Sequence, residues 1–279
     1  MNENKGQLYI CATPIGNLED ITLRVLRVLK EVDLIAAEDT RHTLKLLNHY
    51  DIKTPMTSYH EHNEAGKAVQ LVDKLLGGAS IALVSDCGMP GISDPGHELI
   101  KGCHEAQIPV TVCPGASAGI SALVMSGISA RRYAFEGFLP REKKKRKDIL
   151  GSLASEHRTI ILYEAPHRLL VTLRELYEHL GERQVSIVRE ITKKFEEVRQ
   201  GSLAEMIEYY DENPVKGEFV LIIEGAAKVP QDWPENIMLH VEHYVEAGLS
   251  EMDAMKKAAK DRGVAKSEVY RAYKGGGAG

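Results

Sequence analysis

Three segments rich in glycine, proline and small residues could bind a ligand through the polypeptide backbone. They span residues 13–17, 85–96 and 114–119, and each follows a short apolar run. Such residues permit unusual backbone angles and let a ligand contact N–H and C=O groups directly. Each segment alone could be a tight turn, but three together favour a binding site. No G-x-G-x-x-G follows the first apolar run and no G-x-x-x-x-G-K-[ST] occurs, which disfavours the usual dinucleotide and P-loop sites.

Acidic and histidine side chains follow the second and third apolar runs. Glu38 and Asp39 precede Arg41, and Asp39 could either cap a helix or, with Arg41, shape a substrate entrance. His60 and His62 should lie on the same side of an extended segment, but the spacing supplies no third or fourth metal ligand. We therefore expect no metal site and favour surface or substrate-facing histidines.

A strongly basic stretch lies near the middle of a chain whose formal net charge is −5. Six of the seven residues 141–147 are Lys or Arg. A solvated surface is the ordinary explanation of such a run, but we favour phosphate contact, because a local basic patch can bind RNA on an acidic protein. The candidate phosphate-binding residues are Arg141, Lys143, Lys144, Lys145, Arg146 and Lys147.

These side chains need a scaffold, and the first half of the chain alternates strand-like with helix-like segments. Such alternation is typical of a doubly wound parallel α/β sheet, in which ligands bind beyond the carboxyl ends of the strands. The glycine-rich segments occupy such ends. The sequence predicts strands over 8–12, 34–37, 56–59, 81–84 and 110–112, and helices over 21–32, 43–49, 65–76 and 98–106.

The second half predicts another α/β domain with a mixed sheet. Two of its strands are separated by only a few residues, which indicates a hairpin. We expect a first domain over 1–126 and a second over 127–228. The predicted strands of the second domain are 134–138, 159–163, 185–189, 195–200 and 218–223, and its predicted helices are 166–179 and 202–210.

The last predicted segment, 235–274, is helical and follows a proline-containing linker over 228–234. Gly263 should separate two of its helices, as in a small helix-turn-helix. A plain helical cap and a nucleic-acid reader both remain open. The expected features are helices over 236–246 and 250–262, a Ser250–Asp253 capping pair, a helix opening at Ser267 and a flexible tail over 275–279.

Composition is that of a globular protein, with 43% hydrophobic and 27% charged residues in 279, enough for two domains. The polar first residues show no secretory signal and the apolar runs are too short for a membrane helix. We therefore expect a cytoplasmic protein with no membrane contact. Four cysteines without paired spacing are expected to be reduced thiols in or near a core: Cys11, Cys87, Cys103 and Cys113.

Several motifs, in order along nearly the whole chain, resemble those of the tetrapyrrole-methylase-like (class III) S-adenosylmethionine methyltransferases. More narrowly, the chain is similar to the branch that 2′-O-methylates a cytidine of bacterial small-subunit (16S) ribosomal RNA. Cys87 stands where this branch usually has a small residue such as Ala, a change that a backbone-lined loop tolerates. The matching segments are 12–22, 37–41, 85–96, 114–117, 163–168 and 217–220.

The resemblance implies two α/β domains with S-adenosylmethionine in the cleft between them, often in a homodimer. It also implies 16S ribosomal RNA, in the small ribosomal subunit, as the partner. By analogy, Pro14 and Gly16 border the methyl-donor end of the cofactor. The other implied cofactor-binding residues are Asp86, Gly88, Met89, Pro90, Ser117, Ala118, Tyr163, Glu164, Ala165, Arg189, Glu190, Glu218 and Phe219.

Methyl transfer from a sulfonium depends chiefly on orientation, and a ribose hydroxyl also benefits from a general base. The candidate bases are Glu38, Asp39, His60 and Glu64, among which the sequence does not choose. Arg41 joins the basic run as a candidate phosphate-binding residue. Two other functions stay open, namely methylation of a tetrapyrrole or another small molecule, and a non-catalytic RNA-binding role. The basic run and the C-terminal helices favour RNA over a small molecule.

Overall fold

The computed structural model describes residues 6–214, 216–227 and 233–275. Contacts between residues divide the chain into two units, Met1–Ala226 and Ala227–Gly279. Most of the expected linker, residues 228–232, and the end of the expected glycine-rich tail, residues 276–279, lie outside the described residues. None of the described helices is long and apolar enough to cross a lipid bilayer.

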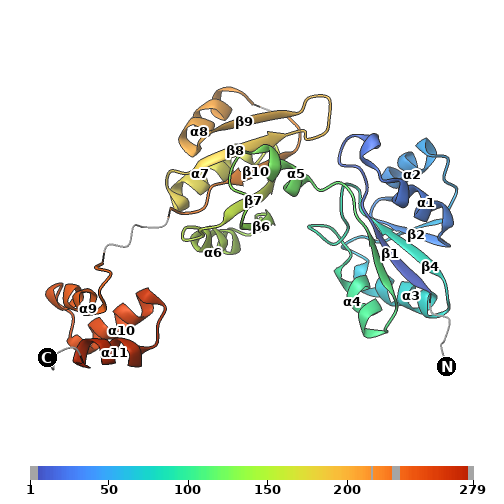
Figure 1. The fold of residues 1–279 in the computed structure, drawn as a ribbon. Helices are drawn as coiled ribbons and strands as arrows, with labels where there is room; N and C mark the ends of the chain where they lie inside the picture. The colour runs from blue at the N-terminus through green and yellow to red at the C-terminus, as the bar shows by residue number, and fades with distance from the viewer. Residues whose placement is uncertain (1–5, 215, 228–232, 276–279) are drawn as a thin grey trace. The chain divides into compact units, whose positions relative to one another are not determined.

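The first unit begins with a sheet of parallel strands, β1 (Gln7–Cys11), β2 (Leu34–Ala37), β3 (Met56–Ser58), β4 (Ser80–Val84) and β5 (Val110–Cys113). The helical elements between them are the 3₁₀ helix η1 (Leu18–Asp20) and the α-helices α1 (Leu23–Glu31), α2 (Thr40–His49), α3 (Glu64–Leu76) and α4 (His97–Glu105). The strand order is β3-β2-β4-β1-β5 (Figure 1). Helices α1 and α2 pack on one face and α3 and α4 on the other, which confirms the predicted doubly wound architecture.

Helix α1 illustrates how the sequence specifies these elements locally. The hydroxyl of Thr22 accepts a hydrogen bond from the Val25 amide and caps the helix. Val25, Val28 and Leu29 then recur at helical spacing and are buried against the sheet. Asp39 caps α2 in the same way, by accepting the Arg41 amide. The capping interpretation of Asp39 is therefore confirmed.

The second sheet of the first unit is mixed, with strands β6 (Tyr133–Phe138), β7 (Thr159–Glu164), β8 (Gln184–Arg189), β9 (Glu197–Ser202) and β10 (Phe219–Ile223). Its order is β6-β7-β10-β8-β9, in which only the β6–β7 pair is parallel. The β8–β9 pair is the predicted hairpin. One face of the sheet is covered by α6 (Lys143–Leu153), α7 (Leu169–Leu180) and α8 (Leu203–Glu212).

Helix α5 (Ala118–Met125) follows β5 in the chain but packs against β7 and β10 of the second sheet. At its start, the Gly119 amide donates a hydrogen bond of 3.0 Å to the Tyr163 hydroxyl. The chain therefore passes from one sheet to the other at residues 114–117, earlier than residue 126. The sequence did not predict α5, which is almost uniformly apolar, or α6, which begins inside the basic run. The division of residues 1–228 into two domains remains a prediction.

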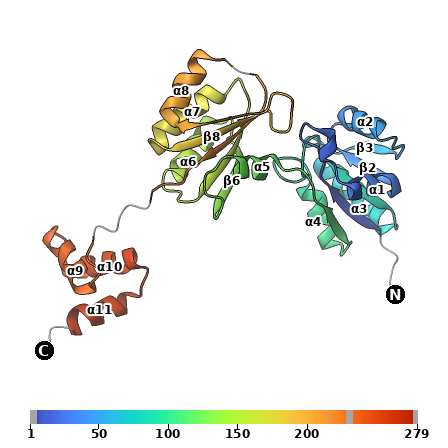
Figure 2. The same ribbon diagram turned by 45° about the horizontal axis from the view of Figure 1, so that its top comes forward.

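The second unit consists, over its described residues, of α9 (Ile237–Glu246), α10 (Glu251–Arg262) and α11 (Lys266–Gly275), which the turned view of Figure 2 separates. Ser250 caps α10 by accepting the Asp253 amide, and Gly263 ends it in the left-handed conformation with φ of 66°. Both features are as predicted. Val241, Ala258 and Val269 are buried between the three helices.

Candidate functional site

The first two glycine-rich segments are hydrogen-bonded to each other at the carboxyl ends of β1 and β4. Thr13 N–H donates to the Gly88 carbonyl at 2.8 Å, and Gly88 N–H donates to the Thr13 carbonyl at 3.1 Å. The Thr13 hydroxyl also donates to the Ser85 carbonyl at 3.0 Å. These strands are parallel neighbours, so their carboxyl ends meet at one edge of the sheet.

Close backbone approaches bring the third segment and the second sheet to the same place. A Cβ atom on Gly115 would lie 2.8 Å from the Cβ of Ala12, so the segment after β5 lies directly against the end of β1. Gly16 has φ of 155°, and a Cβ there would lie 2.4 Å from Cγ of Lys193. Glycine is therefore required at both positions, and the first segment lies against the residues that follow β8.

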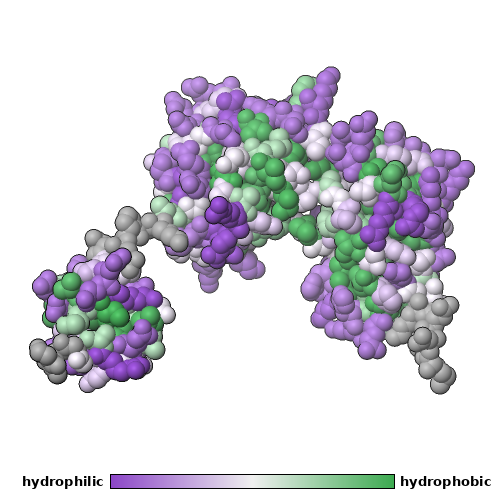
Figure 3. Space-filling view, viewed as in Figure 1, coloured by the Kyte–Doolittle hydropathy of each residue, from purple (hydrophilic) through white to green (hydrophobic). Residues whose placement is uncertain are grey.

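A cavity of about 510 Å³ lies between the three segments and the second sheet. Hydrophobic residues come to the surface around α5 and the strands beside it (Figure 3). The cavity has apolar walls and an acidic side, a combination suited to a small organic cation. Its lining residues are Ile15, Glu38, Asp86, Cys87, Gly88, Met89, Ile92, Ser93, Asp94, Ser117, Ala118, Phe138, Tyr163, Glu164, Ala165, Pro166, Ile191, Glu218, Phe219 and Val220.

The acidic side of the cavity is formed by residues from the ends of β2 and β4. The Asp86 amide donates to the Glu38 carboxylate at 3.2 Å, and the Asp39 amide donates to the Asp86 carboxylate at 3.1 Å. Burial, aided by the nearby Glu38 and Asp86 charges, raises the pKa of Asp94 to about 7. Burial also raises the pKa of Glu38 and outweighs the hydrogen bond from the Asp86 amide, which lowers it; the negative charges of Asp86, Glu61 and Asp39 act in the same direction as burial.

A second cavity, of about 330 Å³, adjoins the first and shares Ile15, Asp86, Cys87 and Glu218 with it. Three basic side chains line it, those of His42, Lys45 and Lys193. Lys193 Nζ donates to Glu190 at 2.8 Å and to Glu218 at 2.9 Å. Burial acts to lower the pKa of Lys193, but the two carboxylates raise it above its usual value.

Comparison with known proteins decides the family. The model of the family described as Tetrapyrrole (Corrin/Porphyrin) Methylases matches residues 7–207. A protein of Halalkalibacterium halodurans named Ribosomal RNA small subunit methyltransferase I is 50% identical over 276 residues, 97% of this chain and 96% of its own. The Bacillus subtilis protein of the same name is 47% identical over 274 residues, 96% of this chain and 94% of its own. This chain belongs to the tetrapyrrole methylase family.

Solved structures of distant tetrapyrrole methylases and of other enzymes share the fold. Uroporphyrin-III C-methyltransferase of Thermus thermophilus, complexed with S-adenyl homocysteine, aligns with a TM-score of 0.55 at 19% identity, over 78% of this chain and 97% of its own. Diphthine synthase aligns with a TM-score of 0.60 at 10% identity, over 78% and 89%. Identities this low establish the fold and nothing more.

The structure brings together most of the residues that the resemblance to the tetrapyrrole methylases implied for the cofactor. Pro90, Arg189 and Glu190 line neither cavity. Pro90 is buried, and Arg189 and Glu190 are engaged with Lys216, Glu197, Lys193 and Glu218. Pro14 and Gly16 line the second cavity. The remaining implied residues line the first cavity: Asp86, Gly88, Met89, Ser117, Ala118, Tyr163, Glu164, Ala165, Glu218 and Phe219.

Of the candidate bases, only Glu38 lines the first cavity. The Arg41 guanidinium hydrogen-bonds Asp39 and lowers the pKa of that carboxyl well below its usual range, which makes Asp39 a poor proton acceptor. The Glu64 carboxylate accepts hydrogen bonds from the amides of Gly96 and Glu98 and from the Tyr59 hydroxyl. Glu64 thus holds the start of α4.

His60 lies in a turn that Asn63 closes, so the expected extended segment is wrong. The rings of His60 and His62 are 5.9 Å apart. Among the described residues, no group of His, Cys, Asp or Glu is placed to hold a metal ion. The four cysteines are free thiols; Cys11, Cys103 and Cys113 are buried, as expected, whereas Cys87 is exposed in the second glycine-rich segment.

The basic run, residues 141–147, forms the start of α6 and the residues before it. All its basic residues except one are placed as expected for phosphate binding. The side chains of Arg141, Lys143, Lys144, Lys145 and Lys147 are exposed. Arg146 is buried, with 6% exposure, and pairs with Glu175 and Thr172 of α7. Its assignment to phosphate binding is therefore wrong. Arg41 is exposed and pairs with Asp39.

Sequence reasoning missed several residues of the cavity. Asp94 is the most informative, because its carboxyl lies near Glu38 and Asp86 and titrates near neutrality. A signal was present, since Asp94 is, besides Asp86, the one charged residue of a segment made mostly of small residues and proline. Ile92 and Ile191 carried no such signal, because an isolated apolar residue in a loop is common. Phe138 carried none either, because it ends β6, and apolar residues are ordinary in a strand.

Proposed function

We propose that this chain is an S-adenosylmethionine-dependent methyltransferase that 2′-O-methylates a cytidine ribose in 16S ribosomal RNA. The observation that carries the proposal is the similarity, at about half of all positions and over nearly the full length, to relatives named Ribosomal RNA small subunit methyltransferase I. The cavity at the sheet edges supports it independently, because its chemistry suits the cofactor.

The cavity residues fit S-adenosylmethionine in size, shape and charge. A volume of about 510 Å³ is within the range of cofactor pockets. Apolar side chains such as Ile92, Phe138 and Ile191 suit an adenine ring and a methionine chain. The carboxylates of Glu38, Asp86 and Asp94 complement the positive charge of a sulfonium and an ammonium. The cofactor supplies a methyl group on an already activated leaving group.

The protein's own contribution is to orient the acceptor and to take its proton. A ribose hydroxyl becomes acidic only as the new bond forms, so a base with a pKa near the working pH is most effective. Asp94 meets this condition, and its carboxyl lines the cavity. Asp94 is our candidate for the proton acceptor, with Glu38 as the alternative.

RNA binding rests on the exposed lysines of α6. Lys143, Lys144 and Lys147 are exposed and have no acidic partner among the ion pairs of the described residues, whereas Lys145 pairs with Glu142 at 2.8 Å. Free ammonium groups in a row can neutralise successive phosphates. The second cavity, with His42, Lys45 and Lys193, adds positive charge beside the first.

A homodimer is part of the proposal, and α5 offers a surface for it. Ile120, Val124 and Met125 are 43%, 74% and 37% exposed on this helix, and Phe135 of neighbouring β6 is 38% exposed. Exposed apolar side chains gathered in this way are typical of protein interfaces. Sedimentation at micromolar concentration, with Val124→Glu as the disrupting variant, tests this part.

The decisive experiment is transfer of labelled methyl from S-adenosylmethionine to small ribosomal subunits taken from a strain that lacks this protein. Digestion and mass analysis would identify the modified nucleoside. A 2′-O-methylated cytidine establishes both reaction and substrate. Label in no RNA, with cofactor binding intact, would overturn the proposal and favour a tetrapyrrole or another small acceptor. Absence of cofactor binding would favour a non-catalytic RNA-binding factor.

A further inference from the structure

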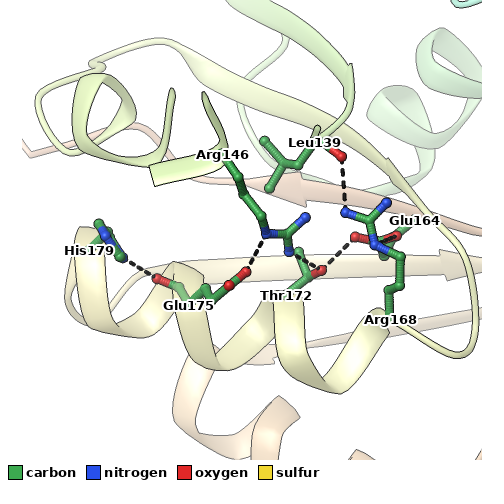
Figure 4. A network of polar contacts seen from close by, with 7 residues as sticks. All are labelled: Leu139, Arg146, Glu164, Arg168, Thr172, Glu175 and His179. Atoms are coloured by element: carbon green, nitrogen blue, oxygen red, sulfur yellow. Dashed lines mark hydrogen bonds and ion pairs between the residues drawn. The ribbon is translucent and has the colours of Figure 1, made fainter. Parts of the chain in front are cut away.

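Arg146 differs from every other basic residue of its run, because its side chain is turned into the protein. Its Nε donates to the Glu175 carboxylate at 2.5 Å, and its Nη2 donates to the Thr172 hydroxyl at 2.7 Å (Figure 4). Both partners lie on α7, one turn apart. An arginine with 6% exposure is costly to bury, so its partners must compensate by specific hydrogen bonds.

The contacts continue from Thr172 to the wall of the first cavity. The Thr172 hydroxyl donates to Oε2 of Glu164 at 2.5 Å, and Oε1 of Glu164 accepts the Ala165 amide at 2.8 Å. Arg168 adds an ion pair to Glu164 at 3.6 Å and donates to the Leu139 carbonyl at 2.9 Å. Glu164, Ala165 and the next residue, Pro166, line the cavity.

The direction of these hydrogen bonds depends on Arg146. A guanidinium has donors and no acceptor, and a hydroxyl has a single proton. Because Arg146 donates to Thr172, the Thr172 proton cannot point toward Arg146 and is directed to Glu164. The buried Glu164 carboxylate, with 2% exposure, is thereby held where it accepts the Ala165 amide.

We propose that Arg146 is a positioning residue for the cofactor, which acts through Thr172 and Glu164 to hold the turn at residues 164–166 against the bound molecule. The inference rests on the proposed function, because it takes the first cavity as the S-adenosylmethionine site. Arg146 does not line the cavity and does not contact the reacting atoms. It therefore affects chiefly the affinity for S-adenosylmethionine rather than the rate of the chemical step.

The test compares five full-length variants in calorimetric titrations with S-adenosylhomocysteine. Arg146→Met keeps the length of the side chain and removes its donors, and Thr172→Val keeps the shape and removes the relaying hydroxyl. We expect each to weaken binding about 10-fold. Their combination should weaken it no further, because both interrupt one chain of contacts. Arg174→Met, at an exposed arginine of α7 paired with Asp211, should leave affinity unchanged.

The fifth variant and two further measurements separate positioning from a general loss of structure. Glu175→Gln retains an acceptor for Arg146 and leaves the relay intact, so it should lower the melting temperature without changing affinity. Under turnover, Arg146→Met and Thr172→Val should raise KM for S-adenosylmethionine while kcat at saturation stays within about twofold.

Three outcomes would overturn the inference. Binding by folded Arg146→Met within twofold of the wild type would do so, as would effects of the two single variants that multiply in the double variant. A loss of affinity in Glu175→Gln equal to that in Arg146→Met would assign the effect to stability alone. Should Arg146→Met fail to fold, Thr172→Val decides by itself. A wild-type protein that does not bind S-adenosylhomocysteine would instead contradict the proposed function.

Discussion

The Glu38 carboxylate accepts a hydrogen bond from the backbone amide of Asp86 at 3.2 Å. The two residues are 48 positions apart in the chain, and they meet because β2 and β4 are adjacent parallel strands that end together, with Ala37 opposite Val84. One consequence is that the acidic side of the cavity is built on residues that directly follow two paired strands. A second consequence is that replacing Asp86 affects both its own segment after β4 and the segment after β2, whose Asp39 amide donates to the Asp86 carboxylate.

Replacing Asp86 with Ala should weaken binding of S-adenosylhomocysteine by about 10- to 100-fold, which corresponds to about 1.4–3 kcal/mol. The variant loses a carboxylate of the cavity and the acceptor of the Asp39 amide. Titration calorimetry measures the effect. Asp73→Ala, at an exposed position of α3, is the matched control. An unchanged dissociation constant for Asp86→Ala would remove this residue from the site.

The Asp94 carboxyl should make stability depend on pH in the cofactor-free protein. Its pKa is about 7 in the folded chain, against an ordinary value near 3.8. Between about pH 4 and pH 7 the folded state therefore keeps the proton of Asp94, whereas the unfolded state loses it. The free energy of unfolding falls as the pH rises through this range and changes no further above it.

Asp94→Asn cannot titrate and should escape this fall. Relative to the wild type, the variant should gain on the order of 1 kcal/mol between pH 5 and pH 8 in urea unfolding, a figure reduced for partial exposure to solvent. In turnover the same variant should lose about 10²–10⁴-fold in kcat if Asp94 accepts the proton, and the wild-type kcat should rise with pH around 7. A fully active Asp94→Asn would transfer this role to Glu38.

Glu64→Ala should affect stability and spare the chemistry. The carboxylate accepts the amides of Gly96 and Glu98 and caps the start of α4, a role worth about 1–2 kcal/mol. Thermal melting and kcat at 25 °C are the paired measurements, with exposed Glu105→Ala of α4 as control. A hundredfold loss of kcat with normal melting would restore Glu64 as a candidate base.

Removing three exposed lysines of α6 together, as Lys143→Ala, Lys144→Ala and Lys147→Ala, should weaken RNA binding and its dependence on salt. Each lost phosphate contact reduces the slope of log K against log salt by about 0.7 for single-stranded RNA, so the slope should fall by about 2. Filter binding at several salt concentrations measures this. The same number of alanine changes at exposed Lys30, Lys53 and Lys74 should leave the slope as it is.

Local patterns were sufficient to predict most of the fold and the location of the cavity. Apolar spacing such as Val25, Val28 and Leu29 specifies a helix, and the alternation of strands with helices specifies parallel pairing. Parallel pairing in turn puts the carboxyl ends of β1, β4 and β5 at one edge, so the glycine-rich segments after them had to converge. These inferences need only neighbours in the chain and the geometry of a sheet.

The roles of individual charged residues depended on partners that lie far away in the chain. Within the basic run nothing distinguishes Arg146 from the lysines beside it. Its helical spacing to the buried Leu150 and Leu153 places it on the inner face of α6, and its acceptors lie on α7, 26 and 29 positions later. Amides at the start of α4 likewise donate to the Glu64 carboxylate. Burial beside Glu38 and Asp86 raises the pKa of Asp94. Burial and hydrogen bonding of a charge are properties of its surroundings in space, so the folded chain alone assigns them.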